Sequence, residues 1–158
     1  NFLVFDKVFI ENIEICDLLK YDSDNVYLIH VKKGFNNNMR SLASQIIISA
    51  RVVSEAIKSN DGRFFEKYYQ SLKNKLGGEF YFNKIGEQTK TIKIAHFVDL
   101  FKKNPVFCIA FCDDGKKERD IREISLSNSN IAKYSIVELH KHLNMQGLSF
   151  KIIQIKYD

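Results

Sequence analysis

Three β-rich segments lie within the first 32 residues of the chain, and the connections between them are short. They cover residues 2–10 (FLVFDKVFI), 13–19 (IEICDLL) and 26–32 (VYLIHVK). A crossover between parallel strands needs about a dozen residues or more, so these connections allow only an antiparallel meander. The start of the chain therefore predicts an antiparallel sheet that must bury at least one face.

The remaining pattern adds helices and further strands. Helical patterns, the clearest of which comes first, cover residues 39–58, 63–75, 94–103 and 133–145. Apolar runs predict strands at residues 106–111 (VFCIAF) and 150–155 (FKIIQI). Weaker patterns predict a short strand and a mobile, basic loop at residues 79–91 and a short strand at 120–125. Because the buried run 106–111 must join the first sheet, the order predicts an α/β fold with a mixed central sheet.

Length and composition fit one domain over residues 1–158. Of these residues 45% are hydrophobic, and every apolar run is far too short to span a bilayer. The chain has only three cysteines, Cys16, Cys108 and Cys112, and this small, odd number argues against a disulfide framework. The cysteines therefore predict a reducing, cytoplasmic compartment. The first residue is Asn1, with no visible signal peptide, so we expect a fragment of a longer protein.

The charge of the chain favours a nucleic-acid partner. The formal net charge is +5, and positive side chains gather locally, as at Lys32, Lys33 and Arg40. Phosphate backbones attract such groups. Lysine-rich surfaces are also common without such a partner, and this alternative stays open.

The end of the third β-rich segment carries the candidate chemistry. Side chains alternate along a strand, so Leu28, His30 and Lys32 share one face. Asp17, near the end of the preceding segment, can approach that face if the two strands pair. Carboxylate oxygens bind Mg²⁺, and a lysine beside the metal can stabilise a phosphate or orient the water. Each residue also has a simpler explanation: an edge-strand charge for Lys32, a turn hydrogen bond for Asp17 and core packing for His30.

A meander that carries an acid, followed by a strand that ends in acid-x-Lys and then a helix, resembles the restriction-endonuclease-like superfamily with its PD-(D/E)xK motif. The resemblance implies a three-layer sandwich with a mixed central sheet, in which Asp17 is the first acid and Lys32 the motif lysine. It also places Gln45 in the helix position where many members carry a glutamine or a basic residue. The run 106–111 would be the fourth core strand.

The sequence departs from the superfamily pattern at the second acid, because it reads His-Val-Lys at residues 30–32. Histidine is a poor ligand for Mg²⁺ but a good ligand for Mn²⁺. It could also act as a general base. Glu14 could replace the missing acid, although strand alternation places it on the opposite face from Asp17 unless a bulge intervenes.

A second resemblance covers more of the chain. The blocks IEICDLL, LIHVKKG, MRSLASQIIISA and IAKYSIVELHKHLNMQGLSFKIIQI resemble the C-terminal part of a sporadically distributed bacterial family of uncharacterised function. The resemblance implies that His30 belongs to the family pattern and that an N-terminal region is missing from this chain. Sporadic distribution is typical of mobile or defence-associated genes.

Two hypotheses follow from these patterns. In the first, the chain is a nuclease-like domain that hydrolyses phosphodiester bonds of DNA with a divalent metal, Mg²⁺ or Mn²⁺. Asp17 and His30 hold the metal and Lys32 acts on the phosphate, and the nucleic acid is contacted by Lys33, Arg40 and Gln45. In the second, the same fold binds nucleic acid or a protein partner without catalysis. Nucleases of this superfamily often pair to cut both strands, so a homodimer is a further option.

Overall fold

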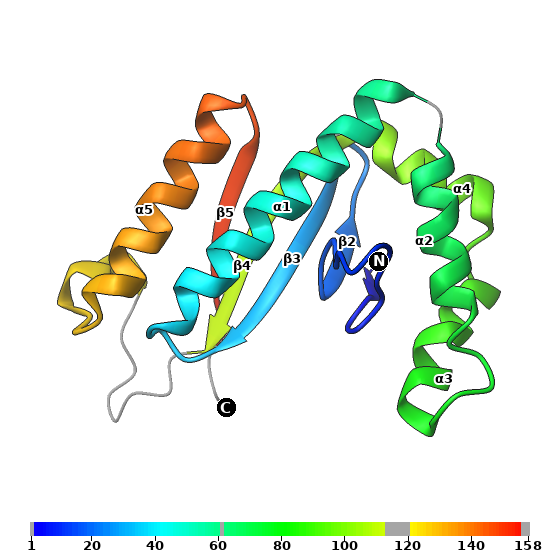
Figure 1. Cartoon of the computed structure of the whole chain (residues 1–158), viewed down its shortest axis with the longest axis horizontal. Helices are drawn as coiled ribbons and strands as arrows, with labels where there is room; N and C mark the ends of the chain where they lie inside the picture. The colour runs from blue at the N-terminus through cyan, green and yellow to red at the C-terminus, as the bar shows by residue number, and fades with distance from the viewer. Residues whose placement is uncertain (1, 61, 113–120, 156–158) are drawn as a thin grey trace.

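The chain folds around a five-stranded mixed sheet (Figure 1). The computed structural model describes residues 2–60, 62–112 and 121–155. The strands, in their order across the sheet, are β1 (Phe2–Val4), β2 (Leu18–Tyr21), β3 (Asn25–Lys33), β4 (Asn104–Cys112) and β5 (Ser149–Ile155). β1, β2 and β3 are antiparallel to one another, whereas β3, β4 and β5 are parallel. The predicted α/β class and the mixed sheet are therefore confirmed.

The two central strands, β3 and β4, are the longest and pair along their whole length, from Asn25 opposite Asn104 to Lys33 opposite Cys112. Parallel neighbours need a crossover, and the helices between residues 38 and 102 supply it. Leu28 and Phe107 are fully buried on the face that packs against the helices. This pair of strands therefore fixes where the end of β3, with His30 and Lys32, lies in the sheet.

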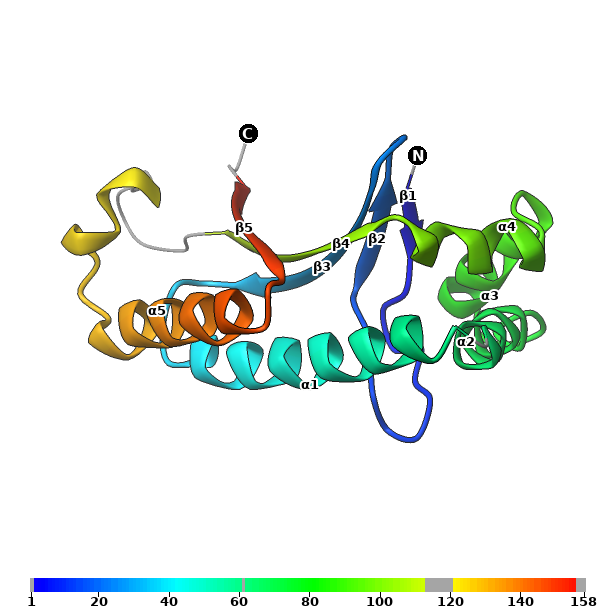
Figure 2. The same cartoon turned by 90° about the horizontal axis from the view of Figure 1, so that it is seen from above.

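Two helices, α1 (Asn38–Ser59) and α5 (Asn130–Met145), lie side by side on one face of the sheet (Figure 2). The buried side chains of α1 recur at helical spacing and include Met39, Leu42, Ile46, Ala50 and Val53. The periodicity that predicted this helix thus reflects a single buried stripe. The sheet and this helix pair form two of the three predicted layers, and the third layer stays a prediction.

A second group of helices lies beyond the β1 end of the sheet (Figures 1 and 2). It contains α2 (Arg63–Lys73), α3 (Phe80–Glu87) and α4 (Ile94–Asp99), which continues into the short helix η2 (Leu100–Lys102). Aromatic stacking joins these helices, since the rings of Phe65 and Phe101 have centroids 3.8 Å apart. Phe97 stacks on Phe5, with centroids 5.8 Å apart, and so attaches the group to the chain that follows β1.

The first two strands are shorter than predicted. Residues 2–10 and 13–19 were expected to be extended, but β1 ends at Val4 and β2 begins only at Leu18. Between them the backbone has positive φ angles at Lys7, Glu11 and Asn12 (57°, 52° and 63°). A residue with positive φ cannot continue a strand, so residues 5–17 form a loop that we call the 5–17 loop.

Two other predictions of local structure are wrong. Residues 79–91 form α3 and the short helix η1 (Gln88–Lys90) instead of a strand and a loop. The Gln88 side chain accepts a hydrogen bond from the Val4 backbone N–H (2.6 Å) and donates one to the Val4 carbonyl (3.0 Å). This tertiary contact fixes a helix whose own apolar pattern is weak. The strand expected at residues 120–125 is the short helix η3 (Ile121–Leu126), and residue 120 lies outside the described residues.

Candidate functional site

The 5–17 loop is held in place at both ends and at its tip. The Phe5 backbone N–H donates to the Asp17 carbonyl (2.7 Å), so the loop leaves β1 and enters β2 at one point of the sheet. Ser49 of α1 donates to the Ile15 carbonyl (2.6 Å), and Tyr68 of α2 donates to the Ile13 carbonyl. Because Phe5 and Asp17 are paired, the next residue along, Asp6, lies close to Asp17.

The loop brings three carboxylates together. One carboxylate oxygen from each of Asp6, Glu14 and Asp17 lies within 4.8 Å of the other two, and each residue is half-buried. We call this set the acidic cluster. Each acid also accepts one hydrogen bond: Glu14 from the Lys7 N–H (2.7 Å), Asp17 from the Val31 N–H (2.6 Å) and Asp6 from the Tyr81 hydroxyl (3.0 Å).

The surroundings disfavour negative charge on these acids. The pKa of Glu14 is raised to about 7, mainly by burial and in smaller part by repulsion from Asp17 and Asp6. The hydrogen bond from Lys7 acts in the opposite direction. Burial also raises the pKa of Asp17, and repulsion by Asp6 adds to this effect. The hydrogen bond from Val31 and the positive charge of Lys32 act in the opposite direction on Asp17. The cluster therefore needs added positive charge to ionise fully near neutral pH.

Three converging carboxylates form the kind of donor set that hard divalent cations bind in proteins. Mg²⁺ and Mn²⁺ prefer oxygen ligands, and carboxylates supply both the ligand atoms and the compensating charge. Such a cation would also remove the repulsion that raises the pKa of Glu14. The donor chemistry of the acidic cluster thus fits Mg²⁺ or Mn²⁺.

Of the residues predicted for the site, Asp17 and Lys32 lie close enough to interact electrostatically. The positive charge of Lys32 acts to lower the pKa of Asp17, against the effect of burial. Lys32 lies on β3 on the same side as Leu28 and His30, as strand alternation predicts. The pairing of β2 with β3, which places Leu18 opposite Ile29, brings the two residues near each other.

His30 lies in a different environment. Only 2% of its surface is exposed, and its Nε2 atom is buried without a hydrogen-bond partner. Burial lowers the pKa of His30 to about 4, while a hydrogen bond to the backbone of Ile15 opposes this change. Within the described part of the chain, the group of possible metal ligands contains Asp6, Glu14 and Asp17 but not His30. The predicted ligand role of His30 stays a prediction.

Lys33, Arg40 and Gln45, the predicted nucleic-acid contacts, all have exposed side chains. Arg40 lines a groove of about 360 Å³ between α1 and α5, whose other lining residues include Ile47 and Tyr134. The structure therefore places Arg40 over the helix layer and not within the acidic cluster. Contact of these three residues with nucleic acid stays a prediction.

The sequence pattern missed Asp6 as a partner of Asp17, and it offered Glu14 only as a replacement for the missing second acid that would require a bulge. Strand alternation would put the side chains of Glu14 and Asp17 on different faces of one strand. Residues 13–17 do not form a regular strand, however, so both side chains can join the same cluster. Asn12 was the one residue in the sequence that could have indicated a turn before Glu14, because asparagine tolerates positive φ.

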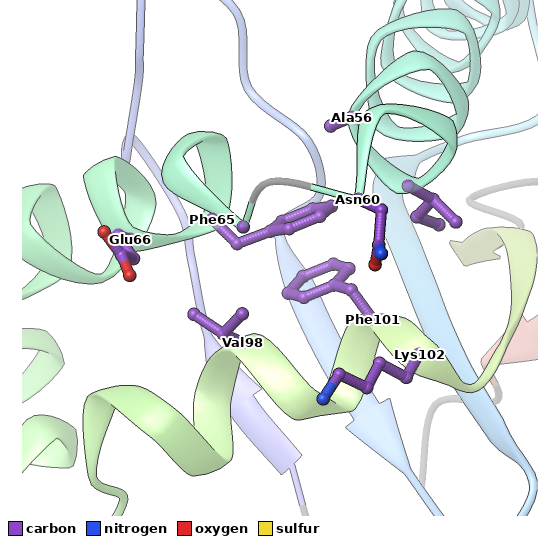
Figure 3. A pocket seen from close by; sticks show the side chains of 9 residues that line it. Ala56, Asn60, Phe65, Glu66, Val98, Phe101 and Lys102 are labelled. Carbon is purple, nitrogen blue, oxygen red and sulfur yellow. The ribbon is translucent and has the colours of Figure 1, made fainter.

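A separate cleft of about 510 Å³ opens between the end of α1, the start of α2 and α4 (Figure 3). Phe65 and Phe101 form its apolar wall, and its charged lining residues are Glu66 and Lys102. Lys102 is already paired with Asp99 at 2.7 Å. This cleft offers packing surface but no converging set of acids or bases, so the acidic cluster is the stronger candidate for chemistry.

Comparison with known protein families, with curated proteins and with solved structures gives no match to this chain. None of the helices among the described residues has the length and apolar character needed to cross a bilayer. The fold and the site together define an α/β protein with a half-buried carboxylate cluster beside strand β3 of a mixed sheet.

Replacing Glu14 tests the electrostatics of the cluster. The pKa of Glu14 in the folded chain, about 7, lies above its ordinary value of 4.5, so ionisation costs stability as the pH rises between these values. Glu14→Gln removes this cost. Without divalent metal, we expect the variant to be more stable than wild type by about 1 kcal/mol above pH 7, a figure reduced for solvent screening.

The measurement is urea unfolding with a chelator present, above pH 7 and near pH 4.5. Glu55→Gln, an exposed acid of α1 paired with Arg51, is the matched control and should show no such gain. A stability difference between Glu14→Gln and wild type that is the same at both pH values would contradict the raised pKa.

Proposed function

We propose that this chain is a divalent-metal-dependent nuclease-like domain with a restriction-endonuclease-like fold that hydrolyses phosphodiester bonds. The observation that carries the proposal is the acidic cluster, three carboxylates within 4.8 Å of one another beside Lys32. The strand order supports it: three antiparallel strands followed, through a helix, by a parallel strand are what the resemblance to the PD-(D/E)xK superfamily implies.

In this proposal Asp6, Glu14 and Asp17 hold Mg²⁺ or Mn²⁺ in place of the predicted pair Asp17 and His30. The bound cation supplies Lewis acidity to the scissile phosphate. Lys32 stabilises the negative charge that develops on the phosphate as water attacks phosphorus and the bond to the leaving oxygen breaks. The attacking water releases a proton to solvent, and the leaving oxygen takes up a proton from solvent. His30 supports the site from the core, because its ring holds the Ile15 carbonyl between Glu14 and Asp17.

The broader setting is part of the same proposal. DNA is the expected nucleic acid, with Lys33, Arg40 and Gln45 as further contacts. The resemblance to the C-terminal part of a sporadic bacterial family supports a role in cytoplasmic defence, together with an N-terminal region of the same protein. Pairing into a homodimer would let two sites cut two strands.

A second candidate function is a non-catalytic module with the same fold that binds nucleic acid or a protein partner. One observation favours it: each acid of the cluster already accepts a hydrogen bond from the protein. Raised pKa values also let Glu14 and Asp17 remain protonated more readily without a metal. The cluster would then only join the 5–17 loop to β3 and α3.

Metal binding and cleavage are measured together to separate the two functions. We expect titration calorimetry to detect Mn²⁺ or Mg²⁺ binding, and we expect metal-dependent cleavage of DNA that a chelator abolishes. Asp17→Asn should weaken metal binding by more than about tenfold, the lower bound for altering even an outer partner of a metal site. Single- and double-stranded DNA and RNA serve as parallel substrates.

Asp24→Asn is the matched control, since Asp24 is an exposed acid in the turn before β3. It should leave metal binding and cleavage at the wild-type level. If the folded wild-type chain binds neither metal and cuts none of the substrates, the proposal fails and the non-catalytic module takes its place.

A further inference from the structure

Helix α3 exposes its aromatic residues to solvent. Phe80 is 77% exposed and Tyr81 is 49% exposed, whereas Phe82 is half-buried beside them. Ile85 and Gly86 form the buried side of the same helix. Two neighbouring aromatic side chains on the outer surface of a short helix contribute little to the core, so they are available to a ligand.

Lysine ammonium groups lie over these rings. Lys84 Nζ is 4.5 Å from the centroid of the Phe80 ring, and Lys75 Nζ is 4.6 Å from that of Phe82. Lys7, from the 5–17 loop, approaches the other side of the set, with its Nζ 5.9 Å from the Phe82 centroid. Three lysines and three aromatic rings thus gather around α3, and we call this set the aromatic–basic surface (Phe80, Tyr81, Phe82, Lys7, Lys75 and Lys84).

This surface adjoins the acidic cluster directly. The Tyr81 hydroxyl donates to Asp6 Oδ2 (3.0 Å), so α3 contacts one of the three carboxylates directly. Lys7 carries an aromatic contact through its side chain and a hydrogen bond to Glu14 through its backbone. A chain-like ligand on the aromatic–basic surface would therefore continue into the acidic cluster.

We propose that the aromatic–basic surface binds single-stranded nucleic acid and presents it to the acidic cluster. Exposed phenyl rings can stack only on bases that are not already stacked within a duplex. Lysines over the rings can contact the phosphates of the same strand. The placement at a cleaving site rests on the proposed function, but the binding preference for single strands does not.

The acids of the α3 segment itself, Glu79 and Glu87, do not cancel the charge of the three lysines. Glu79 precedes α3 and is exposed, while Glu87 at the end of the helix is paired with Lys90 at 3.1 Å. Among the described residues, neither Lys75 nor Lys84 forms an ion pair with a carboxylate. Their ammonium groups face aromatic rings instead, and rings do not neutralise charge.

The test compares nucleic acids of one sequence by fluorescence anisotropy at low salt, with a chelator present so that no metal or cleavage contributes. The probes are a short DNA oligonucleotide without self-complementarity, its RNA equivalent and the DNA as a duplex. We expect the single strands to bind at least about fivefold tighter than the duplex, the factor given by one stacked base. The two single-stranded arms show which sugar the surface prefers.

Phe80→Ala should weaken single-strand binding about five- to tenfold and leave duplex binding unchanged. Lys84→Gln should reduce the slope of log affinity against log salt by about 0.7, the value for one phosphate contact on a single strand. Both side chains are exposed, so both variants should fold, which circular dichroism checks. Tyr134→Ala, 70% exposed on α5, and Lys141→Gln are the matched controls and should bind as wild type.

Two results would overturn the inference: duplex binding as tight as single-strand binding, or single-strand binding that Phe80→Ala leaves intact. Failure of the proposed function gives a different pattern. In that case the single-strand preference persists in chelator, but added Mg²⁺ or Mn²⁺ produces no cleavage of any probe.

Discussion

Lys32→Met should reduce the rate of metal-dependent cleavage about a hundred- to a thousandfold, while metal affinity changes little. The side chain of Lys32 is half-buried at the end of β3, and its charge acts on Asp17. A positive charge in this position stabilises the phosphate most strongly when extra negative charge develops, which happens only in the transition state. The loss should therefore appear in kcat and much less in KM.

Methionine keeps most of the length and packing of lysine, so the substitution removes charge with little change in shape. Lys20→Met is the matched control, because Lys20 is exposed on neighbouring β2 and lies near the Tyr27 ring, 5.8 Å from its centroid. We expect the control to retain the wild-type kcat. Cleavage by Lys32→Met at the wild-type rate, in a chain that still binds metal, would remove Lys32 from the chemistry.

The central part of the fold was predictable because its local pattern and its environment agree. The run 106–111 is buried throughout, and the apolar stripe of residues 39–58 faces one surface, so each pattern had one structural solution. α3 was missed for the opposite reason. Its aromatic residues are exposed, and contacts to β1 through Gln88 decide its conformation, which no local periodicity reveals.

The candidate site was predictable only in part. Asp17 and Lys32 were predictable because β2 pairs with β3: Asp17 immediately precedes β2, and Lys32 lies near the end of β3. Asp6 and Glu14 depend on the path of the 5–17 loop, which positive φ angles and contacts to Ser49 and Tyr68 determine. Contacts of this kind join residues far apart in the sequence, so one sequence alone does not disclose them.

The environment of His30 shows how the core and the acidic cluster are coupled. The Ile15 carbonyl receives hydrogen bonds from Ser49 and from the His30 ring. Ile15 itself is fully buried, and it stands between Glu14 and Asp17 in the sequence. Protonation of His30 would place an uncompensated charge in the core beside this anchor, with Nε2–H lacking an acceptor.

His30 should therefore make the stability of the fold strongly dependent on pH. Its pKa falls from 6.5 to about 4 on folding, so between these values the unfolded chain binds the proton more tightly. The stability that neutral His30 contributes is complete above pH 6.5 and is lost as the pH falls towards 4. Because the side chain is only 2% exposed, the loss amounts to about 3 kcal/mol.

His30→Gln isolates this contribution, since glutamine can still donate to Ile15 but does not titrate. Above pH 6.5 we expect the variant to be less stable than wild type, because it fits the site less well. Towards pH 4 the difference should shift in favour of the variant by about 3 kcal/mol, as measured by urea unfolding in chelator. His140→Gln, an exposed histidine of α5, should show no comparable shift. A stability difference that stays constant from pH 6.5 to 4 would mean that folding does not lower the pKa of His30.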